Sequence, residues 1–209
     1  MPVDRAQPTP TLDPRAQRTR AALRTAVLEL TATRRIEDIS VSELAAAAGV
    51  NRSSFYRNAD SPEALLRDAL YEDFDVWRSS VLGTLPLGEP MREAWRQASL
   101  RIAHHVDRHR GVYETGLGDP ELPSAALLRI TTSHFESSIE QYLEAHPSVL
   151  PPADDGAEPL PATVYARYIG SGTVGLIRAW LETPQPRSAQ AYARTTLAIL
   201  PSWLFDLPS

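Results

Sequence analysis

Helix-boundary signals are crowded into residues 40–66, and they leave room for only short helices between them. Ser40 stands directly before an apolar helical pattern, and Glu43 follows three residues later. This spacing is typical of a capping box, in which the hydroxyl caps the first turn and the carboxylate reaches back to the cap residue. Gly49 then stops the helical pattern, so we expect a short helix over 41–48.

A second helix start closes the same stretch at Ser61-Pro62. Proline suits the first helical position because its φ is preset and its missing N–H would be unpaired there. We expect this helix to continue through Leu82. Within 15–34, apolar residues at helical spacing predict a first amphipathic helix, namely Leu23, Ala26, Val27 and Leu30. Further helices are predicted over 90–110, about 120–145, 161–182 and 187–205. No convincing strand or internal repeat is found, so the predicted fold class is all-α.

A short helix, a glycine turn and a second short helix, packed on a longer first helix, form a helix-turn-helix. Val50 and Phe55 are expected to point to its core. The outer face then carries an amide, small hydroxyls, a tyrosine and two arginines: Asn51, Arg52, Ser53, Ser54, Tyr56 and Arg57. Amides and hydroxyls can approach base edges in a major groove, and tyrosine and arginine can reach phosphates. A helical hairpin with solvated arginines fits the same spacing.

The charge of the chain is divided unevenly along its length. Residues 15–58 hold eight arginines against four acids, a net charge of +4, while residues 59–209 hold 12 arginines against 20 acids, a net charge of −8. A basic segment joined to an acidic body suggests a polyanion-binding head on a domain that avoids polyanions. Ordinary charge fluctuation is the alternative explanation.

The composition argues against several classes of protein. The chain has no cysteine, so neither a disulfide framework nor a thiol-based zinc site can form. Its first residues lack the apolar segment of a signal peptide, and no apolar run approaches the roughly 18 residues of a membrane span. The longest run, Tyr168 to Ile177, is closed by Arg167 and Arg178. We therefore expect a soluble cytoplasmic protein with no membrane partner.

Three glycines, Gly170, Gly172 and Gly175, spell the dinucleotide-binding pattern G-x-G-x-x-G. That pattern binds a cofactor only between a strand and a helix, with an acidic residue about 20 positions later. Here a helical stretch precedes the pattern, and Thr195 stands 20 residues after Gly175. We expect no cofactor and no enzyme, and a dinucleotide-binding enzyme is the less favoured alternative.

The same glycines fit a packing seam on the helix predicted over 161–182. The seam has spacings of 3, 4, 3 and 4 and consists of Tyr165, Tyr168, Gly172, Gly175 and Ala179. A neighbouring stripe can face the protomer's own core. The last helix repeats this pattern with Tyr192, Thr196, Ile199 and Trp203. Two helices with two apolar faces each need a partner, so we predict a symmetric four-helix homodimer interface.

Residues 18–66 resemble the DNA-binding head of the TetR/AcrR family of bacterial regulators. The resemblance is carried by the hydroxyl cap, the AAxAGV run, the aromatic-Tyr pair and the start of helix four, here Ser40, Ala45–Val50, Phe55-Tyr56 and Ser61–Leu66. A second stretch, residues 167–184, resembles the family's dimerisation helix. The family usually has His-Phe where this chain has Asn58-Ala59, and a lysine where it has Pro62.

Residues 1–14 hold four prolines and few apolar residues, which predicts a disordered arm. The resemblance implies a three-helix helix-turn-helix DNA-binding domain (15–60) and a C-terminal helical ligand-binding and dimerisation domain (61–209). It also implies the DNA-contact residues, with Tyr56 on a phosphate: Ser40, Asn51, Arg52, Ser53, Ser54, Tyr56 and Arg57. The implied function is that of a transcriptional regulator, a repressor that binds a pseudo-palindromic double-stranded DNA operator as a dimer. A small-molecule effector would release it.

A ligand cavity is expected among the helices of residues 62–145. Its candidate lining residues are aromatic residues and histidines: Trp77, Trp95, His104, Tyr113, His134, Phe135 and Tyr142. His105 and His109 have metal-ligand spacing, but no third ligand is evident, so no metal site is predicted. A helical dimeric adapter with weakened DNA binding is the alternative function, since Ala59 and Pro62 depart from the family pattern.

Overall fold

The computed structural model describes residues 14–81, 87–119, 121–151 and 160–205, without the side chains of residues 73 and 76–81. Helices make up nearly all of this part of the chain, and it contains no strand. The α-helices are α1 (Pro14–Thr31), α2 (Val41–Ala47), α3 (Arg52–Tyr56), α4 (Pro62–Val81), α5 (Glu89–Arg108), α6 (Arg110–Leu117), α7 (Ala125–Ala145), α8 (Ala162–Leu181) and α9 (Ala189–Ile199). Short 3-10 turns lie at Ile36–Asp38, Pro147–Val149 and Ser202–Leu204.

Most helix starts follow from the cap residues of the sequence. The hydroxyl of Ser40 accepts from the backbone N–H of Glu43 at 3.3 Å, and the Glu43 carboxylate accepts from the Ser40 backbone N–H at 2.9 Å. The predicted capping box is therefore confirmed. Ser61 caps α4 in the same way, accepting from the backbone N–H of Ala64 at 3.1 Å, and Pro62 is the first helical residue.

One helix was not expected from the sequence. The prediction over 90–110 covers α5, but the chain turns at His109 (φ −103°, ψ 31°) and continues as α6. Gly111 suggests a helix stop in the sequence, yet it lies inside α6. A Cβ at Gly111 would come within 2.8 Å of the Ala32 side chain, so its lack of a side chain lets α6 approach the end of α1 closely.

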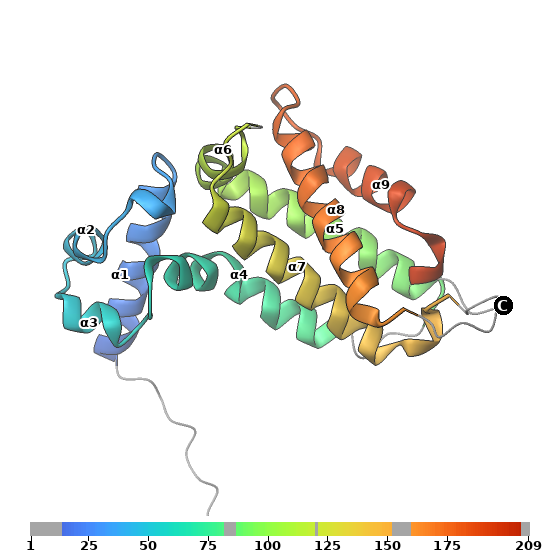
Figure 1. Cartoon of the computed structure of the whole chain (residues 1–209), viewed down its shortest axis with the longest axis horizontal. Helices are drawn as coiled ribbons and strands as arrows, with labels where there is room; N and C mark the ends of the chain where they lie inside the picture. The colour runs from blue at the N-terminus through green and yellow to red at the C-terminus, as the bar shows by residue number, and fades with distance from the viewer. Residues whose placement is uncertain (1–13, 82–86, 120, 152–159, 206–209) are drawn as a thin grey trace, which may run out of the picture.

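The helices form a small head and a larger body that share α4 (Figure 1). In the head, α2 and α3 pack beside α1. From there α4 runs into the body, where it lies beside α7, while α8 packs on α7 and α9 on α5. One apolar core runs from Leu23 and Phe55 in the head to Trp180 and Tyr192 in the body, and a second core surrounds Met91. The predicted arm and the residues of 152–159 lie outside the described part of the chain.

The head is also tied to the body by polar contacts outside α4. The Glu37 carboxylate accepts from the hydroxyl of Ser124, the cap of α7, at 2.8 Å and from the backbone N–H of Ala126 at 2.9 Å. Partial burial raises the pKa of Glu37, but these hydrogen bonds outweigh burial and lower it overall. A neighbouring bond joins the hydroxyl of Thr115 to the Ala32 carbonyl at 2.9 Å. The end of α1 and the turn after it are therefore anchored to α6 and α7.

Candidate nucleic-acid interface

The short helix α3 begins at an asparagine cap. The Oδ1 atom of Asn51 accepts from the backbone N–H of Ser54 at 2.8 Å and so satisfies one of the unpaired donors of the helix. An asparagine amide also carries two N–H donors, which this cap does not use. Asn51 can therefore hold the helix in place and still donate to an external acceptor.

Neighbouring aromatic residues of α3 face opposite environments. Phe55 is fully buried in the head core, whereas Tyr56 is 52% exposed. Their ring centroids lie 5.5 Å apart in an edge-on contact, so the buried ring supports the exposed one. The prediction that Phe55 points to the core is confirmed, and the Tyr56 ring is accessible to a partner.

The C-terminal end of α3 is closed by side chains that follow it. Arg57 donates to the Ser54 hydroxyl at 2.8 Å, and Asn58 donates from Nδ2 to the Ser54 carbonyl at 2.8 Å. Asn58 thus satisfies a carbonyl that the helix itself leaves unpaired. Any contact of Arg57 with DNA would exchange its bond to Ser54 for a bond to the nucleic acid.

The turn before α3 depends on a glycine. Gly49 has φ +65°, in the left-handed region that residues with a side chain rarely adopt. This confirms the turn predicted between the two short helices. The backbone N–H of Val50 then bonds the Ala45 carbonyl at 2.9 Å, which closes the end of α2. The glycine therefore fixes the angle at which α3 leaves α2.

Arginines of the predicted basic head pair with carboxylates of the described residues. Arg20 and Arg24 both reach Glu72 on α4, at 2.8 and 3.2 Å. Arg34 pairs with Glu43 at 2.9 Å, and Arg35 approaches Asp119 at 4.0 Å. The positive charge of α3 and its C-cap comes from Arg52 and Arg57, so the cationic surface at this helix is smaller than the sequence count suggests.

Ser40 lies at the start of α2 with its hydroxyl already bonded. The hydroxyl donates to the Glu43 carboxylate at 2.8 Å. Hydrogen bonds from the backbone and hydroxyl of Ser40 and from Arg34 lower the pKa of Glu43 to about 2, so this exposed carboxylate stays ionised at neutral pH. A phosphate at Ser40 would therefore meet a negative charge beside it.

The two departures from the family pattern have structural explanations. Ala59 is buried in the head core, where its methyl group packs with Phe55 in one apolar cluster. Pro62 occupies the first position of α4, where proline is well tolerated. Both residues suit the fold, but Pro62 brings no cation to the start of α4.

The outer face of α8 lies on the opposite part of the molecule from α3 and has the opposite character. We define it by Val164, Tyr168, Gly172, Gly175 and Ala179, all of which are exposed. Tyr168 is 79% exposed. A Cβ built at Gly172 or Gly175 would have no heavy atom of the described chain within 4 Å. Ile199 on α9 is 61% exposed beside a groove of about 630 Å³ that Tyr168 and Gly172 also line.

The third glycine of the pattern faces inward. A Cβ at Gly170 would lie 2.9 Å from the backbone N of Glu136, so this glycine allows α8 to approach α7 closely. All three glycines lie inside α8, with no strand before them in the described part of the chain. The arrangement is that of two helix-packing faces, and it gives no support to dinucleotide binding.

The other residues predicted for the dimer seam differ in how deeply they are buried within the protomer. Tyr192 and Thr196 on α9 are buried within the protomer, and the Tyr192 ring packs against Trp180 with centroids 5.2 Å apart. Tyr165 and Trp203 are half-buried and contact each other edge-on at 5.5 Å. The surface that a partner could reach is therefore the α8 outer face together with Ile199.

The residues predicted to line a ligand cavity do not share one cavity. Tyr113 and Tyr142 are fully buried packing residues, and Phe135 is buried with them, while Trp95 packs edge-on against Tyr142 at 5.4 Å. His104 is exposed beside a groove of about 290 Å³. The side chain of Trp77 lies outside the described residues. Of the predicted side chains that the structure describes, His134 alone is among the residues that line a cleft of about 630 Å³ between α4 and α7.

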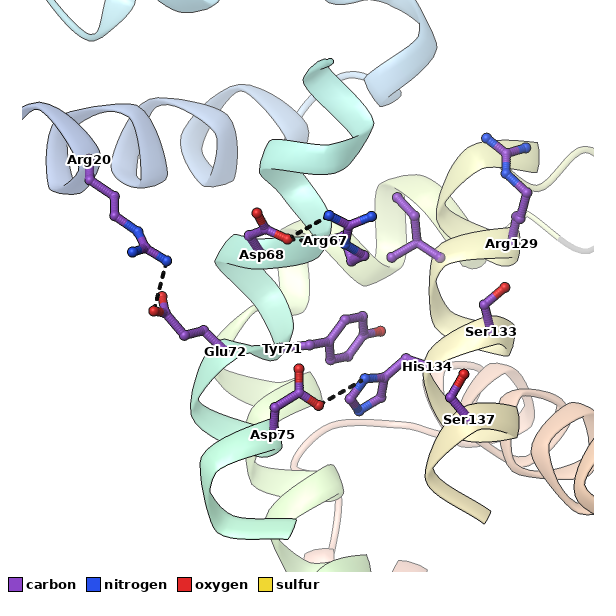
Figure 2. A pocket seen from close by; sticks show the side chains of 11 residues that line it. Arg20, Arg67, Asp68, Tyr71, Glu72, Asp75, Arg129, Ser133, His134 and Ser137 are labelled. Atoms are coloured by element: carbon purple, nitrogen blue, oxygen red, sulfur yellow. Dashed lines mark hydrogen bonds and ion pairs between the residues drawn. The ribbon is translucent and has the colours of Figure 1, made fainter. Parts of the chain in front are cut away.

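That cleft, which we call the junction cleft, has a volume of about 630 Å³ and lies between α4 and α7 (Figure 2). Sequence reasoning missed it because its lining is mostly polar and comes from three helices. On both α4 and α7 the lining residues recur at the spacing i, i+4, i+8, and this spacing is the feature of the sequence that could have indicated the cleft. The lining residues are Arg20, Arg67, Asp68, Tyr71, Glu72, Asp75, Arg129, Ile130, Ser133, His134 and Ser137.

A buried polar network lies behind the junction cleft. The Tyr71 hydroxyl donates to Thr131 Oγ1 at 3.1 Å and lies 3.1 Å from the Tyr113 hydroxyl, which in turn lies 3.0 Å from His105 Nε2. Burial raises the pKa of Tyr71 to about 12. Burial is the main cause that lowers the pKa of His105 to about 3, and the nearby His109 and Arg108 side chains act in the same direction. The network is therefore neutral at physiological pH.

No group of three or more His, Cys, Asp or Glu residues suited to a metal ion is found among the described residues. Within those ranges, none of the helices has both the length and the apolar character that a membrane crossing requires.

Solved structures share this fold at low sequence identity. NalD of Pseudomonas aeruginosa, described as the secondary repressor of the MexAB-OprM multidrug efflux pump, matches with a TM-score of 0.54 and 19% identity over 88% of this chain and 94% of its own. A TetR transcriptional regulator of Streptococcus agalactiae matches with 0.56 and 20% over the same shares. The fatty acid degradation regulator FadR of Bacillus halodurans matches with 0.55 and 14% over 93% and 97%.

No protein-family profile and no curated protein matches the chain. The likeness to solved structures therefore establishes the fold, which is the all-helical fold of TetR-type regulators. The α2–α3 pair is the helix-turn-helix of that fold.

Proposed function

We propose that this protein is a DNA-binding transcriptional regulator that binds a pseudo-palindromic operator as a homodimer and responds to a small-molecule effector. The observation that carries the proposal is the construction of α3. It is a five-residue helix whose buried side is a single aromatic residue and whose other side chains are polar or cationic. A helix of this kind fits the major groove of duplex DNA.

The roles of individual residues follow from their accessibility. Asn51, Arg52 and Ser53 are exposed at the N-terminal end of α3, the end that contacts base edges in helix-turn-helix proteins. Tyr56 and Arg57 are exposed at the other end, where a hydroxyl and a guanidinium can reach phosphates. Ser54 and Ser40 are engaged in bonds within the head, so their contribution to DNA contact is the weakest of the predicted set.

The dimer is proposed from the α8 outer face. Glycines at the middle of an exposed helix face let two backbones approach closely, and Tyr168 and Ile199 add apolar area that a partner copy would cover. A symmetric dimer pairs this face with itself, because the same patch on both protomers must meet across a two-fold axis. Two heads placed in this way would read two half-sites about 34–36 Å apart, or a multiple of that spacing.

A helical adapter with weakened DNA binding is the second candidate. It is favoured by the four head arginines that pair with carboxylates and by the absence of a cation at Pro62. The two candidates differ in whether the chain prefers any DNA sequence.

Selection from a random duplex pool separates the two. We expect enrichment of one inverted-repeat sequence, followed by fluorescence anisotropy binding to it that is at least about 10³-fold tighter than to shuffled DNA. Tyr56→Phe should weaken binding to all sequences similarly, while changes at Asn51 or Ser53 should alter the preferred sequence. A pool that converges on nothing, with weak and salt-insensitive binding, would support the adapter instead.

A further inference from the structure

The junction cleft between α4 and α7 is large enough to hold a small molecule. Its volume of about 630 Å³ is within the usual range for small-molecule sites, about 300–1,000 Å³. Its walls are α4 and α7, and Arg20 of α1 also contributes to the lining. A ligand in this cleft would therefore touch both the body and the head.

Charges of both signs line the cleft, with Arg67 paired to Asp68 and Arg20 paired to Glu72 (Figure 2). Arg67 on α4 and Arg129 on α7 lie at one end, and Asp75 lies at the other end, with a carboxylate oxygen 3.7 Å from Nδ1 of His134. Eight residues of helix separate Arg67 from Asp75, a distance of about 12 Å along the axis. Arg129 and Asp75 therefore place opposite charges toward the two ends of the cleft.

The cationic end is available to a ligand. Arg129 makes no ion pair with any described residue, and Arg67 pairs only with its chain neighbour Asp68, at 2.9 Å. An exposed pair of this kind contributes little, so an external anion can compete for the guanidinium. A carboxylate or phosphate can accept two parallel hydrogen bonds from an arginine.

The floor of the cleft is rigid. The Tyr71 and His134 rings stack with centroids 3.9 Å apart and an interplanar angle of 9°. The Tyr71 hydroxyl is held from behind by its bonds to Thr131 and Tyr113. Ser133 and Ser137 place hydroxyls along the α7 wall. A ligand would therefore bind a surface that needs little reordering.

We propose that the junction cleft binds a small dipolar molecule, with an anionic group at Arg67 and Arg129 and a cationic group at Asp75 and Glu72, separated by about 8–12 Å. A purely anionic ligand would meet the carboxylates of the α4 wall. A purely cationic one would meet the guanidinium groups of the other end. A molecule with both charges meets an oppositely charged side chain at each end.

The site is connected to the head through Glu72. This residue lies three positions before Asp75 on the same helix and pairs with Arg20 and Arg24 of α1. The cationic group of the ligand competes with Arg20 for the Glu72 carboxylate, which loosens the ion pair between α1 and α4. This consequence for DNA rests on the proposed regulator function, whereas ligand binding itself does not.

Isothermal titration calorimetry on the full chain tests the site with three matched probes: 8-aminooctanoate, octanoate and octylamine. We expect 8-aminooctanoate to bind at least about tenfold tighter than either single-charge probe. Arg129→Ala and Asp75→Asn should each weaken it by about tenfold or more. The matched controls Arg194→Ala and Glu144→Gln remove the same charges from exposed positions outside the cleft and should bind it as the wild type does.

Equal affinity for octanoate and 8-aminooctanoate, or unchanged binding by Arg129→Ala, would overturn the proposed site. Binding of the selected operator is measured separately, with and without 8-aminooctanoate. A chain that binds its operator but not the probe refutes the cleft and leaves the regulator intact. A chain that binds the probe but no operator supports the cleft and refutes the regulator.

Discussion

The helices α3 and α8 both bury one side in the protomer and expose the other, but the exposed sides differ in chemistry. On α3 the exposed residues are an arginine, a serine and a tyrosine, flanked by Asn51 and Arg57 at its two ends. On α8 the exposed side has glycines and an alanine flanked by Val164 and Tyr168. A polar, cationic face suits a hydrated polyanion, whereas a small, apolar face suits a second protein backbone.

The two helices also differ in what holds them in place. α3 has only five residues, so its own hydrogen bonds cannot sustain it in water, and it depends on the Asn51 cap and the burial of Phe55. α8 has 20 residues and is held along its length by α7, with Gly170 at the point of close approach. The polar face is thus carried by a short, capped helix and the apolar face by a long, packed one.

The largest change in stability is expected when the buried and the exposed aromatic residues of α3 are substituted one at a time. Phe55→Ala should lower the free energy of unfolding by about 3–5 kcal/mol, because it removes a fully buried ring. Tyr56→Ala should change stability far less and instead weaken operator binding. Urea denaturation and anisotropy on the same two variants give both quantities. If Tyr56→Ala were as destabilising as Phe55→Ala, α3 would have no free outer side.

The corresponding pair on α8 is Gly170 and Gly172. Gly170→Leu should destabilise the protomer by about 1–3 kcal/mol or more, because the new side chain overlaps the α7 backbone. Gly172→Leu has open space within the protomer, so it should leave protomer stability nearly unchanged and raise the dimer dissociation constant by about tenfold or more. Sedimentation at several concentrations reports the second effect. An undisturbed dimer in Gly172→Leu would refute the α8 interface.

The pH dependence of the folding free energy reports on the interior of the protomer and not on the outer faces of α3 and α8. His105 has a pKa of about 3 in the folded protein against an ordinary value of 6.5, so below pH 6.5 the unfolded chain binds one more proton. Stability should therefore fall as the pH drops from 6.5 towards 3, by up to about 1.4 kcal/mol per pH unit from this residue. His105→Gln should have a shallower slope in urea melts between pH 7.5 and 5. Identical slopes would mean that His105 is not a buried neutral group.

The smallest effect on operator binding is expected at the start of α4. Pro62→Lys restores a cation at the start of α4, and it should tighten operator binding at low salt. It should also steepen the plot of log K against log[salt] by about 0.9 per protomer, or about 1.8 per dimer. Loss of the proline should cost about 0.4–1 kcal/mol, which thermal melting measures independently. An unchanged salt slope would place the start of α4 away from the phosphates.

Local signals in the sequence predicted much of the head. The capping box at Ser40, the left-handed Gly49 and the proline at the start of α4 are each fixed by one or two neighbouring residues. The burial of Phe55 followed from helical spacing. The two sides of α8 also followed from spacing, since Gly172 and Gly175 fall on a different stripe from Ile169 and Trp180.

Features set by distant contacts could not be predicted in this way. Arg20 and Arg24 pair with Glu72, some 50 residues away, so a charge count along the chain overstated the cationic head. The start of α6 depends on the packing of Gly111 against Ala32. The junction cleft likewise requires α4 and α7 to lie side by side. No local pattern specifies these distances.

Hydroxyl-radical footprinting on the selected operator tests whether α3 reads DNA, and sedimentation of the same complex gives the number of protomers. We expect two protected half-sites related by a two-fold axis, with centres one helical turn (about 10–10.5 base pairs) or a multiple of it apart, occupied by two protomers. Tyr56→Ala should lose both half-sites together. A single uninterrupted region of protection that does not depend on sequence, or two half-sites that survive in Tyr56→Ala, would contradict the assignment of α3 as the DNA-reading helix.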